Sequence, residues 1–262
     1  MLGSRLPKIV TQAKTFIQFR LSLCPNVRDS LLSIRGMEIS RGRVDEAYRV
    51  CMPRLELSTG EVAAIVGPSG CGKSTLLESL GLILKPDQVE EFRLQDMDLA
   101  SNKSLSLQRR EKYWARVRQH CMGFVPQTGG LLPFLSVKQN IELSTKMSGT
   151  ALSATVQQTV IERLNLGPLL KRLPRDLSIG ERQRVSFARS IAHQPMLLLA
   201  DEPTAALDPL LAKELFSLIV DISRELRISA LIVTHEWSIV ADLGIRQITA
   251  QIQADRRTIF SD

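Results

Sequence analysis

Residues 67–75 read Gly67-Pro68-Ser69-Gly70-Cys71-Gly72-Lys73-Ser74-Thr75, and this stretch decides the fold. It lies between an apolar run over 62–66, which predicts a buried strand, and a run over 76–84 with helical spacing. The spacing G-x-x-x-x-G-K-[ST] between a strand and a helix is that of a phosphate-binding loop. Glycines let the backbone N–H groups surround an anion, and the following helix adds the positive end of its dipole. The stretch therefore predicts nucleoside triphosphate binding, with Lys73 on the β- and γ-phosphates and the Ser74 hydroxyl on Mg²⁺.

Length and composition predict one globular α/β domain with room for an inserted subdomain. The chain has 262 residues, of which 44% are hydrophobic and 23% are charged. No apolar run approaches the roughly 18 residues that a membrane-spanning helix needs, so any membrane function requires a separate partner. The cysteines are scattered rather than clustered, which indicates a reducing cytoplasm and no disulfide framework. They are Cys24, Cys51, Cys71 and Cys121.

The positive charge of the chain is concentrated in residues 1–36. These carry six basic residues and one acidic residue, which accounts for +5 of the net charge of +7. Three interpretations of this leader are open: a basic helix on an anionic membrane, a transit peptide, or a flexible extension ahead of a domain at 37–262. The flexible extension is favoured because the apolar stripe formed by Ile9, Val10, Phe16 and Ile17 is short and interrupted.

Apolar runs and turn signals predict the order of the elements after Met37. Strands are expected over 54–57, 62–66, 123–125, 196–200 and 228–233, and a helix over 104–120. Turn signals separate several helical runs over about 128–180, which predicts an inserted helical subdomain. The expected fold class is α/β: a P-loop NTPase with a mostly parallel core sheet, an N-terminal antiparallel β part and an inserted α-helical subdomain.

The helix expected over 104–120 carries a run of basic residues, Arg109, Arg110, Lys112, Arg116 and Arg118. A nucleic-acid patch is one interpretation, but no loop aromatics are arranged beside it for base stacking. A solvated helix face is favoured. Outside the leader the charge is nearly balanced, so no nucleic-acid partner is expected for the folded core.

Two acids, Asp201 and Glu202, end the apolar run over 196–200. In a phosphate-loop enzyme the first carboxylate holds Mg²⁺, directly or through water. Glu202 would then stand at the carboxyl edge of the sheet, where it could polarise a water in line with the γ-phosphate. The two acids alone would fit a charged turn equally well, but the upstream phosphate loop favours the catalytic interpretation.

Four more features follow in chain order. They are Gln127 after a short strand, Leu177-Ser178-Ile179-Gly180-Glu181-Arg182-Gln183-Arg184 before a helix, Ala205-Ala206-Leu207-Asp208 after Glu202, and His235 at the end of a strand. With the loop and the acids they resemble the nucleotide-binding subunit of an ATP-binding cassette (ABC) transporter over about residues 37–255. In that resemblance 67–75 is Walker A, Gln127 the Q-loop, 177–183 the signature motif, 196–202 Walker B, 205–208 the D-loop and His235 the switch histidine.

The resemblance implies an ATP hydrolase with ATP and Mg²⁺ as cofactors. It implies catalytic roles for Glu202, His235 and Gln127, and a metal site formed by Ser74, Gln127 and Asp201. A second copy of the chain would pair head-to-tail with the first, so that ATP contacts loop 67–75 of one copy and Ser178, Gly180 and Glu181 of the other. The chain would be cytoplasmic and peripheral, held on the inner face of the cell membrane by an integral-membrane permease.

The run over 125–137, with Leu131-Leu132-Pro133 after the Q-loop, is similar to the lipoprotein-releasing LolD group and its MacB-like relatives. The D-loop departs from the Gly-Asn-Leu-Asp usual in that group. An alternative function is a soluble ABC ATPase acting on DNA or ribosomes, although the second cassette, coiled-coil insertion or zinc module typical of that class is not visible. A third is a nucleotide-binding regulator without turnover, against which the presence of Glu202 and His235 argues.

Two expectations concern the surroundings of the loop. The family usually stacks adenine on an aromatic residue upstream, where this chain has the segment 41–45, so the cation of Arg41 or Arg43 could take that position. Tyr48 is the nearest aromatic. Cys71 stands at the start of a helix, and the helix dipole is expected to lower its pKa, although a small residue is needed there in any case.

Overall fold

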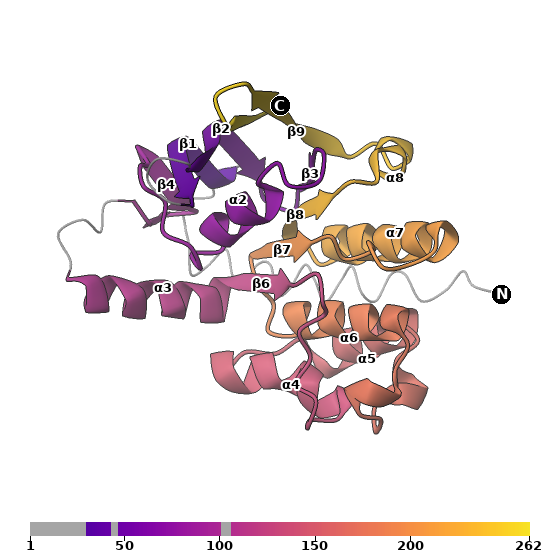
Figure 1. The fold of residues 1–262 in the computed structure, drawn as a ribbon. Coiled ribbons are helices and arrows are strands. Elements are labelled where there is room, and N and C mark those ends of the chain that lie inside the picture. The colour runs from indigo at the N-terminus through magenta and orange to yellow at the C-terminus, as the bar shows by residue number, and fades with distance from the viewer. Residues whose placement is uncertain (1–29, 43–46, 101–105) are drawn as a thin grey trace.

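The computed structural model describes residues 30–42, 47–100 and 106–262, and in these residues one sheet of ten strands runs through the molecule (Figure 1). Its strand order is β5-β4-β1-β2-β10-β9-β3-β8-β7-β6. The strands are β1 (Ser30–Arg41), β2 (Tyr48–Ser58), β3 (Val62–Val66), β4 (Glu91–Leu94), β5 (Met97–Asp98), β6 (Met122–Val125), β7 (Leu197–Asp201), β8 (Ser229–Thr234), β9 (Arg246–Gln253) and β10 (Arg257–Ser261).

The centre of the sheet is parallel. Strand β3 pairs in parallel with β8 and β9, and β7 pairs in parallel with β8 and β6. All five residues of β3 are buried, as expected of a strand covered on both faces. Because these strands run in one direction, the residues that follow β3, β7 and β8 meet at one edge of the sheet, and the functional residues lie there.

The N-terminal part is antiparallel. Strand β1 pairs with β2 from Ser30–Ser58 to Arg41–Tyr48 and with β4 on its other side, and β5 extends the sheet from β4. Strand β1 starts at Ser30, so it includes residues 30–36, which the sequence assigned to the leader. The rest of the predicted leader, residues 1–29, lies outside the described residues, so its three interpretations stay open.

Helices cover both faces of the sheet: α2 (Lys73–Leu80), α3 (Leu107–Cys121), α7 (Pro209–Glu225) and α8 (Trp237–Asp242). Successive side chains of β3 point to opposite faces of the sheet, so they pack into two different apolar clusters. Val62, Ala64 and Val66 belong to an apolar cluster that includes α7, whereas Ala63 and Ile65 belong to a second cluster that includes α2 and β1. The expected α/β fold class is confirmed.

The region between β6 and β7 is helical, and its last helix extends beyond residue 180, where the sequence placed the end of the insert. It contains α4 (Val137–Ser148), α5 (Ala154–Arg163), the short 3₁₀ turns η3 (Gly167–Leu169) and η4 (Pro174–Asp176), and α6 (Ile179–Ile191). Figure 1 shows α4, α5 and α6 gathered at one end of the molecule, below β6 and β7. Buried Asn140 fixes its first loop by accepting from the Leu132 N–H at 2.9 Å and donating to the Leu135 carbonyl at 2.9 Å. No helix in the described residues has both the length and the apolar character needed to cross a bilayer.

Candidate active site

The phosphate loop connects β3 to α2, and two of its glycines have backbone angles that other residues rarely adopt. Gly70 has φ +77° and Gly72 has φ +94°. A Cβ at Gly72 would also lie 2.4 Å from Cγ2 of Val50. Gly67 is packed as closely, since a Cβ there would lie 2.6 Å from that of Ala250. The base of the loop therefore rests on β2 and β9.

The phosphate loop is exposed at its tip and buried just after it. Pro68, Ser69 and Gly70 are exposed, whereas Cys71 is buried beneath them and Thr75 lies in the first turn of α2. The expectation for the Cys71 thiol is wrong, because burial raises its pKa and outweighs the nearby Lys73 charge, which lowers it.

Lys73 points into the loop. Its ammonium group donates to the carbonyl oxygens of Gly67 and Pro68, each at 2.9 Å, and lies 3.6 Å from Oε1 of Glu202. Only 4% of the side chain is exposed. The single cation of the loop is thus held between the loop carbonyls and the acid at the end of β7.

Ser74 and Asp201 bring two oxygen atoms together at the edge of the sheet. The Ser74 hydroxyl donates to Oδ1 of Asp201 at 3.0 Å. Burial raises the pKa of Asp201, the Ser74 hydrogen bond lowers it, and the negative charges of Glu202 and Glu78 raise it again. A hydroxyl and one carboxylate are donors that Mg²⁺ takes when phosphates and waters supply its other ligands. In the part of the chain that the structure describes, no group of three or more His, Cys, Asp or Glu residues offers a metal site made of protein alone.

Glu202 is contacted by both residues that the sequence predicted as its catalytic partners. Nε2 of Gln127 donates to Oε2 of Glu202 at 3.5 Å, and Nδ1 of His235 lies 3.5 Å from the same oxygen. The backbone of Glu202 has φ +43°, in the left-handed region, and its N–H donates to the Val233 carbonyl at 2.9 Å. The Glu202 carboxylate is therefore held at the edge of the sheet between Gln127, His235 and Lys73.

The signature residues lie at the start of α6. Ser178 caps this helix by accepting from the Glu181 N–H at 3.2 Å, and the Glu181 carboxylate accepts from the Ser178 N–H at 2.7 Å. That backbone hydrogen bond lowers the pKa of Glu181. A Cβ at Gly180 would lie 3.4 Å from Cδ2 of Leu207, at the end of a flexible side chain. Among the described residues, neither Ser178 nor Gly180 has a hydrogen bond or ion pair to the phosphate loop of its own chain.

A side chain farther along α6 links the signature helix to the Q-loop. Nε2 of Gln183 donates to the backbone carbonyl of Gln127 at 2.6 Å, and Gln183 is buried. Sequence reasoning did not assign Gln183 this contact, because it joins residues 56 positions apart.

Arg41, one of the two cations considered for adenine stacking, lies opposite Tyr48, the nearest aromatic residue, in the first strand pair, β1 with β2. The other cation, Arg43, lies outside the described residues. The Tyr48 hydroxyl is hydrogen-bonded to the Thr258 hydroxyl and lies 3.5 Å from the Cys71 carbonyl, so it supports the loop from below. Arg41 forms an ion pair with Glu78 of α2, a contact that the sequence analysis missed.

Comparison with known proteins assigns the family. A family model described as "ABC transporter" matches residues 52–205. The lipoprotein-releasing system ATP-binding protein LolD 2 of Caulobacter vibrioides is 36% identical over 216 residues, with 80% of this chain and 90% of that protein covered. LolD 1 of Rhodopirellula baltica is 38% identical, with 73% of this chain and 81% of that protein covered.

Solved structures agree with the sequence matches. A dimeric bacterial ABC transporter cassette superposes with a TM-score of 0.71 at 27% identity, covering 87% of this chain and 96% of the other. A dimeric post-hydrolysis state of such a cassette, bound to ADP and Pi, gives a TM-score of 0.70, also at 27% identity, with 87% and 96% covered. These matches favour transport over the DNA or ribosome alternative. Since sequence and structure both match over most of the chain, it belongs to the ABC transporter family as an ATP-binding and ATP-hydrolysing subunit.

Proposed function

We propose that two copies of this chain pair head-to-tail around two ATP molecules and drive a separate integral-membrane permease of the lipoprotein-releasing type. The observation that carries the proposal is the division of the site within one chain. Lys73, Ser74 and Glu202 lie at one edge of the sheet, whereas Ser178 and Gly180, at the start of α6, make no hydrogen bond to that edge among the described residues. A second copy would supply the missing helix N-terminus, which favours an anion such as the γ-phosphate.

In this proposal each residue at the sheet edge has a separate task. Lys73 binds the β- and γ-phosphates, while Ser74, Asp201 and Gln127 hold Mg²⁺, which would neutralise phosphate charge when bound. Glu202 accepts a proton from the attacking water, and His235 fixes the orientation of that carboxylate. The remaining loop residues, from Gly67 to Thr75, bind phosphate through their backbone N–H groups. Glu181 contributes by capping the helix that faces the γ-phosphate of the other copy.

The permease would bind beside the Q-loop. Phe134 is 73% exposed in the loop between β6 and α4, and the partly buried Leu131 precedes it. Exposed apolar side chains at one place on a surface mark protein contacts. Docking there would hold the chain on the inner face of the cell membrane, and the names of its lipoprotein-releasing relatives support an envelope lipoprotein as cargo.

Replacing Ser178 by aspartate tests the head-to-tail dimer. Aspartate caps a helix as well as serine does, but its charge would face the γ-phosphate held by the other copy. In a Glu202→Gln background we expect ATP-dependent dimers to be lost, with ATP binding by the monomer retained, as measured by light scattering and fluorescent ATP. Ser178→Asn, an uncharged cap, is the matched control. Equal dimerisation of the aspartate and asparagine variants would contradict the proposal.

Copurification tests the permease. We expect the tagged chain, expressed at its natural level and extracted in mild detergent, to bring down one multi-span membrane protein, and Phe134→Asp to lose it while keeping its ATPase activity. Leu210→Asp, which places the same charge at an exposed apolar residue of α7, is the control. Stimulation of the ATPase by DNA or ribosomes, without a membrane protein in the eluate, would favour the alternative class.

A further inference from the structure

Glu78 adds a carboxylate to the face of α2 that carries Ser74. The two residues are four positions apart in α2, so their side chains lie on the same face of the helix. Ser74 is the residue whose hydroxyl donates to Asp201 at 3.0 Å. Glu78 therefore stands one helical turn behind the oxygen pair proposed to hold Mg²⁺.

One turn of α2 separates Glu78 from Ser74, which contacts Asp201, so the charge of Glu78 lies near the edge of the sheet. Burial is the main reason that the pKa of Asp201 is raised, and the charges of Glu202 and Glu78 also raise it. Three carboxylates, those of Asp201, Glu202 and Glu78, therefore act on this edge of the sheet. Lys73 is the one cation that the phosphate loop sets against them. An unpaired Glu78 would add to the repulsion of a polyphosphate bound in the loop.

Arg41 neutralises this carboxylate from a fixed position. It is the last residue of β1, and its guanidinium group forms an ion pair with Glu78. The preceding N–H, of Ser40, donates to Oδ2 of Asp87 at 2.6 Å, and the Asp87 N–H donates to the Glu38 carbonyl at 2.9 Å. The end of β1 is therefore tied to the segment that follows α2.

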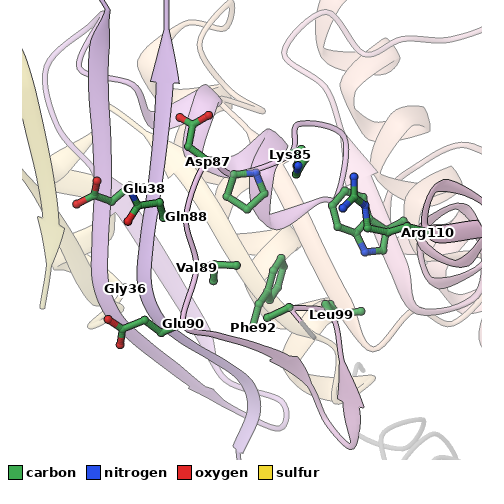
Figure 2. A pocket seen from close by; sticks show the side chains of 13 residues that line it. Gly36, Glu38, Lys85, Asp87, Gln88, Val89, Glu90, Phe92, Leu99 and Arg110 are labelled. Carbon is green, nitrogen blue, oxygen red and sulfur yellow. The ribbon is translucent and has the colours of Figure 1, made fainter. Parts of the chain in front are cut away.

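Glu38 and Asp87 also line a cavity of about 760 Å³ between β1, residues 85–90 and α3 (Figure 2). Asp87 and Gln88 lie beside Glu38, and Gln88 forms an isolated antiparallel bridge with it. No residue of the phosphate loop lines the cavity. On the helix side, the Glu78 carbonyl accepts from the N–H groups of Ile83 and Leu84 at 2.9 and 3.1 Å. The segment after α2 thus forms hydrogen bonds both with the backbone of Glu78 and with the backbone at the end of β1, next to Arg41.

We propose that Arg41 is a positioning residue for nucleotide binding, which acts by neutralising Glu78 and so lowers the repulsion of the polyphosphate by the acidic edge. This inference rests on the proposed nucleotide site at Lys73. It gives Arg41 a different task from adenine stacking: its effect is on the phosphates, and it is transmitted through a second side chain.

The test is a mutant cycle read by equilibrium binding of fluorescent ATP. We expect Arg41→Ala to raise the Kd about threefold, a modest change because the pair is partly exposed. The increase should be larger in EDTA than in Mg²⁺, since Mg²⁺ cancels part of the polyphosphate charge, and it should shrink in high salt. Arg41→Lys should preserve the affinity, and Glu78→Gln should restore it in the Arg41→Ala chain.

Inorganic tripolyphosphate separates the proposal from adenine stacking. We expect Arg41→Ala to weaken competition by tripolyphosphate by the same factor as it weakens ATP binding. If tripolyphosphate competes equally well with both chains, or if the double variant binds as weakly as Arg41→Ala, or if Arg41→Ala has no effect, the proposal is overturned. Lys73→Ala is measured in parallel: unchanged affinity there would overturn the proposed site itself, whereas a loss there with no effect at Arg41 overturns only this inference.

Discussion

Lys73→Ala is expected to weaken ATP binding about a hundredfold. The ammonium group lies among two loop carbonyl oxygens and the carboxylate of Glu202, and its side chain is almost completely buried. Its removal leaves three acceptor groups facing the phosphates with no cation between them. Truncating one partner of a buried charge pair costs about 3 kcal/mol, which corresponds to about a hundredfold in Kd. Isothermal titration with Mg²⁺ and ATP measures the loss.

An exposed lysine provides the control for this variant. Lys138 lies in α4, 67% exposed and 3.7 Å from Glu142, so Lys138→Ala removes the same charge without touching the loop. We expect wild-type affinity from it. Thermal unfolding of both variants establishes that they are folded. Undiminished ATP binding by Lys73→Ala would show that the nucleotide does not bind in loop 67–75.

Glu202→Gln is expected to reduce ATP hydrolysis by about 10²- to 10⁴-fold, the range typical of a lost general base, while ATP binding persists. Glutamine retains the shape and polarity that Gln127 and His235 contact, but it cannot take a proton from water at neutral pH. ATP should therefore accumulate unhydrolysed in a stable dimer. Phosphate release and light scattering in the presence of ATP measure the two effects.

Glu236, the residue just before α8, supplies a matched control for this variant. Its Oε1 lies 3.6 Å from Nε2 of His235, so Glu236→Gln makes the same chemical change on the other side of the same imidazole. We expect turnover near the wild-type value. Turnover by Glu202→Gln equal to that of Glu236→Gln would remove Glu202 as the base.

Local sequence patterns predicted the features that depend on neighbouring residues. A buried strand, a glycine-rich loop and a helix are adjacent in the chain, so their order alone positions Lys73 and Ser74. Asp201, the last residue of β7, and Glu202 after it were predicted for the same reason. Parallel pairing of β3, β8 and β7 then brings the strand ends together, and the structure places Gln127 and His235 beside Glu202.

Features that depend on tertiary packing were missed or wrong. The leader was extended to residue 36 because its basic residues masked the alternation that buries Leu32 and Ile34 in β1. The pKa of Cys71 was expected to fall with the helix dipole, but the loop buries the thiol and burial prevails. The Arg41–Glu78 pair joins residues 37 positions apart.

Gln127 is held at both of its ends by different parts of the molecule. Its side chain contacts the carboxylate of Glu202, at the end of a strand of the sheet, and its main-chain carbonyl accepts from Gln183, in a helix that packs with α4. A change of charge or position at Glu202 therefore alters the restraint on the residue from which the helical insert begins. One residue thus links the carboxylate at the edge of the sheet both to the start of the helical insert and to α6.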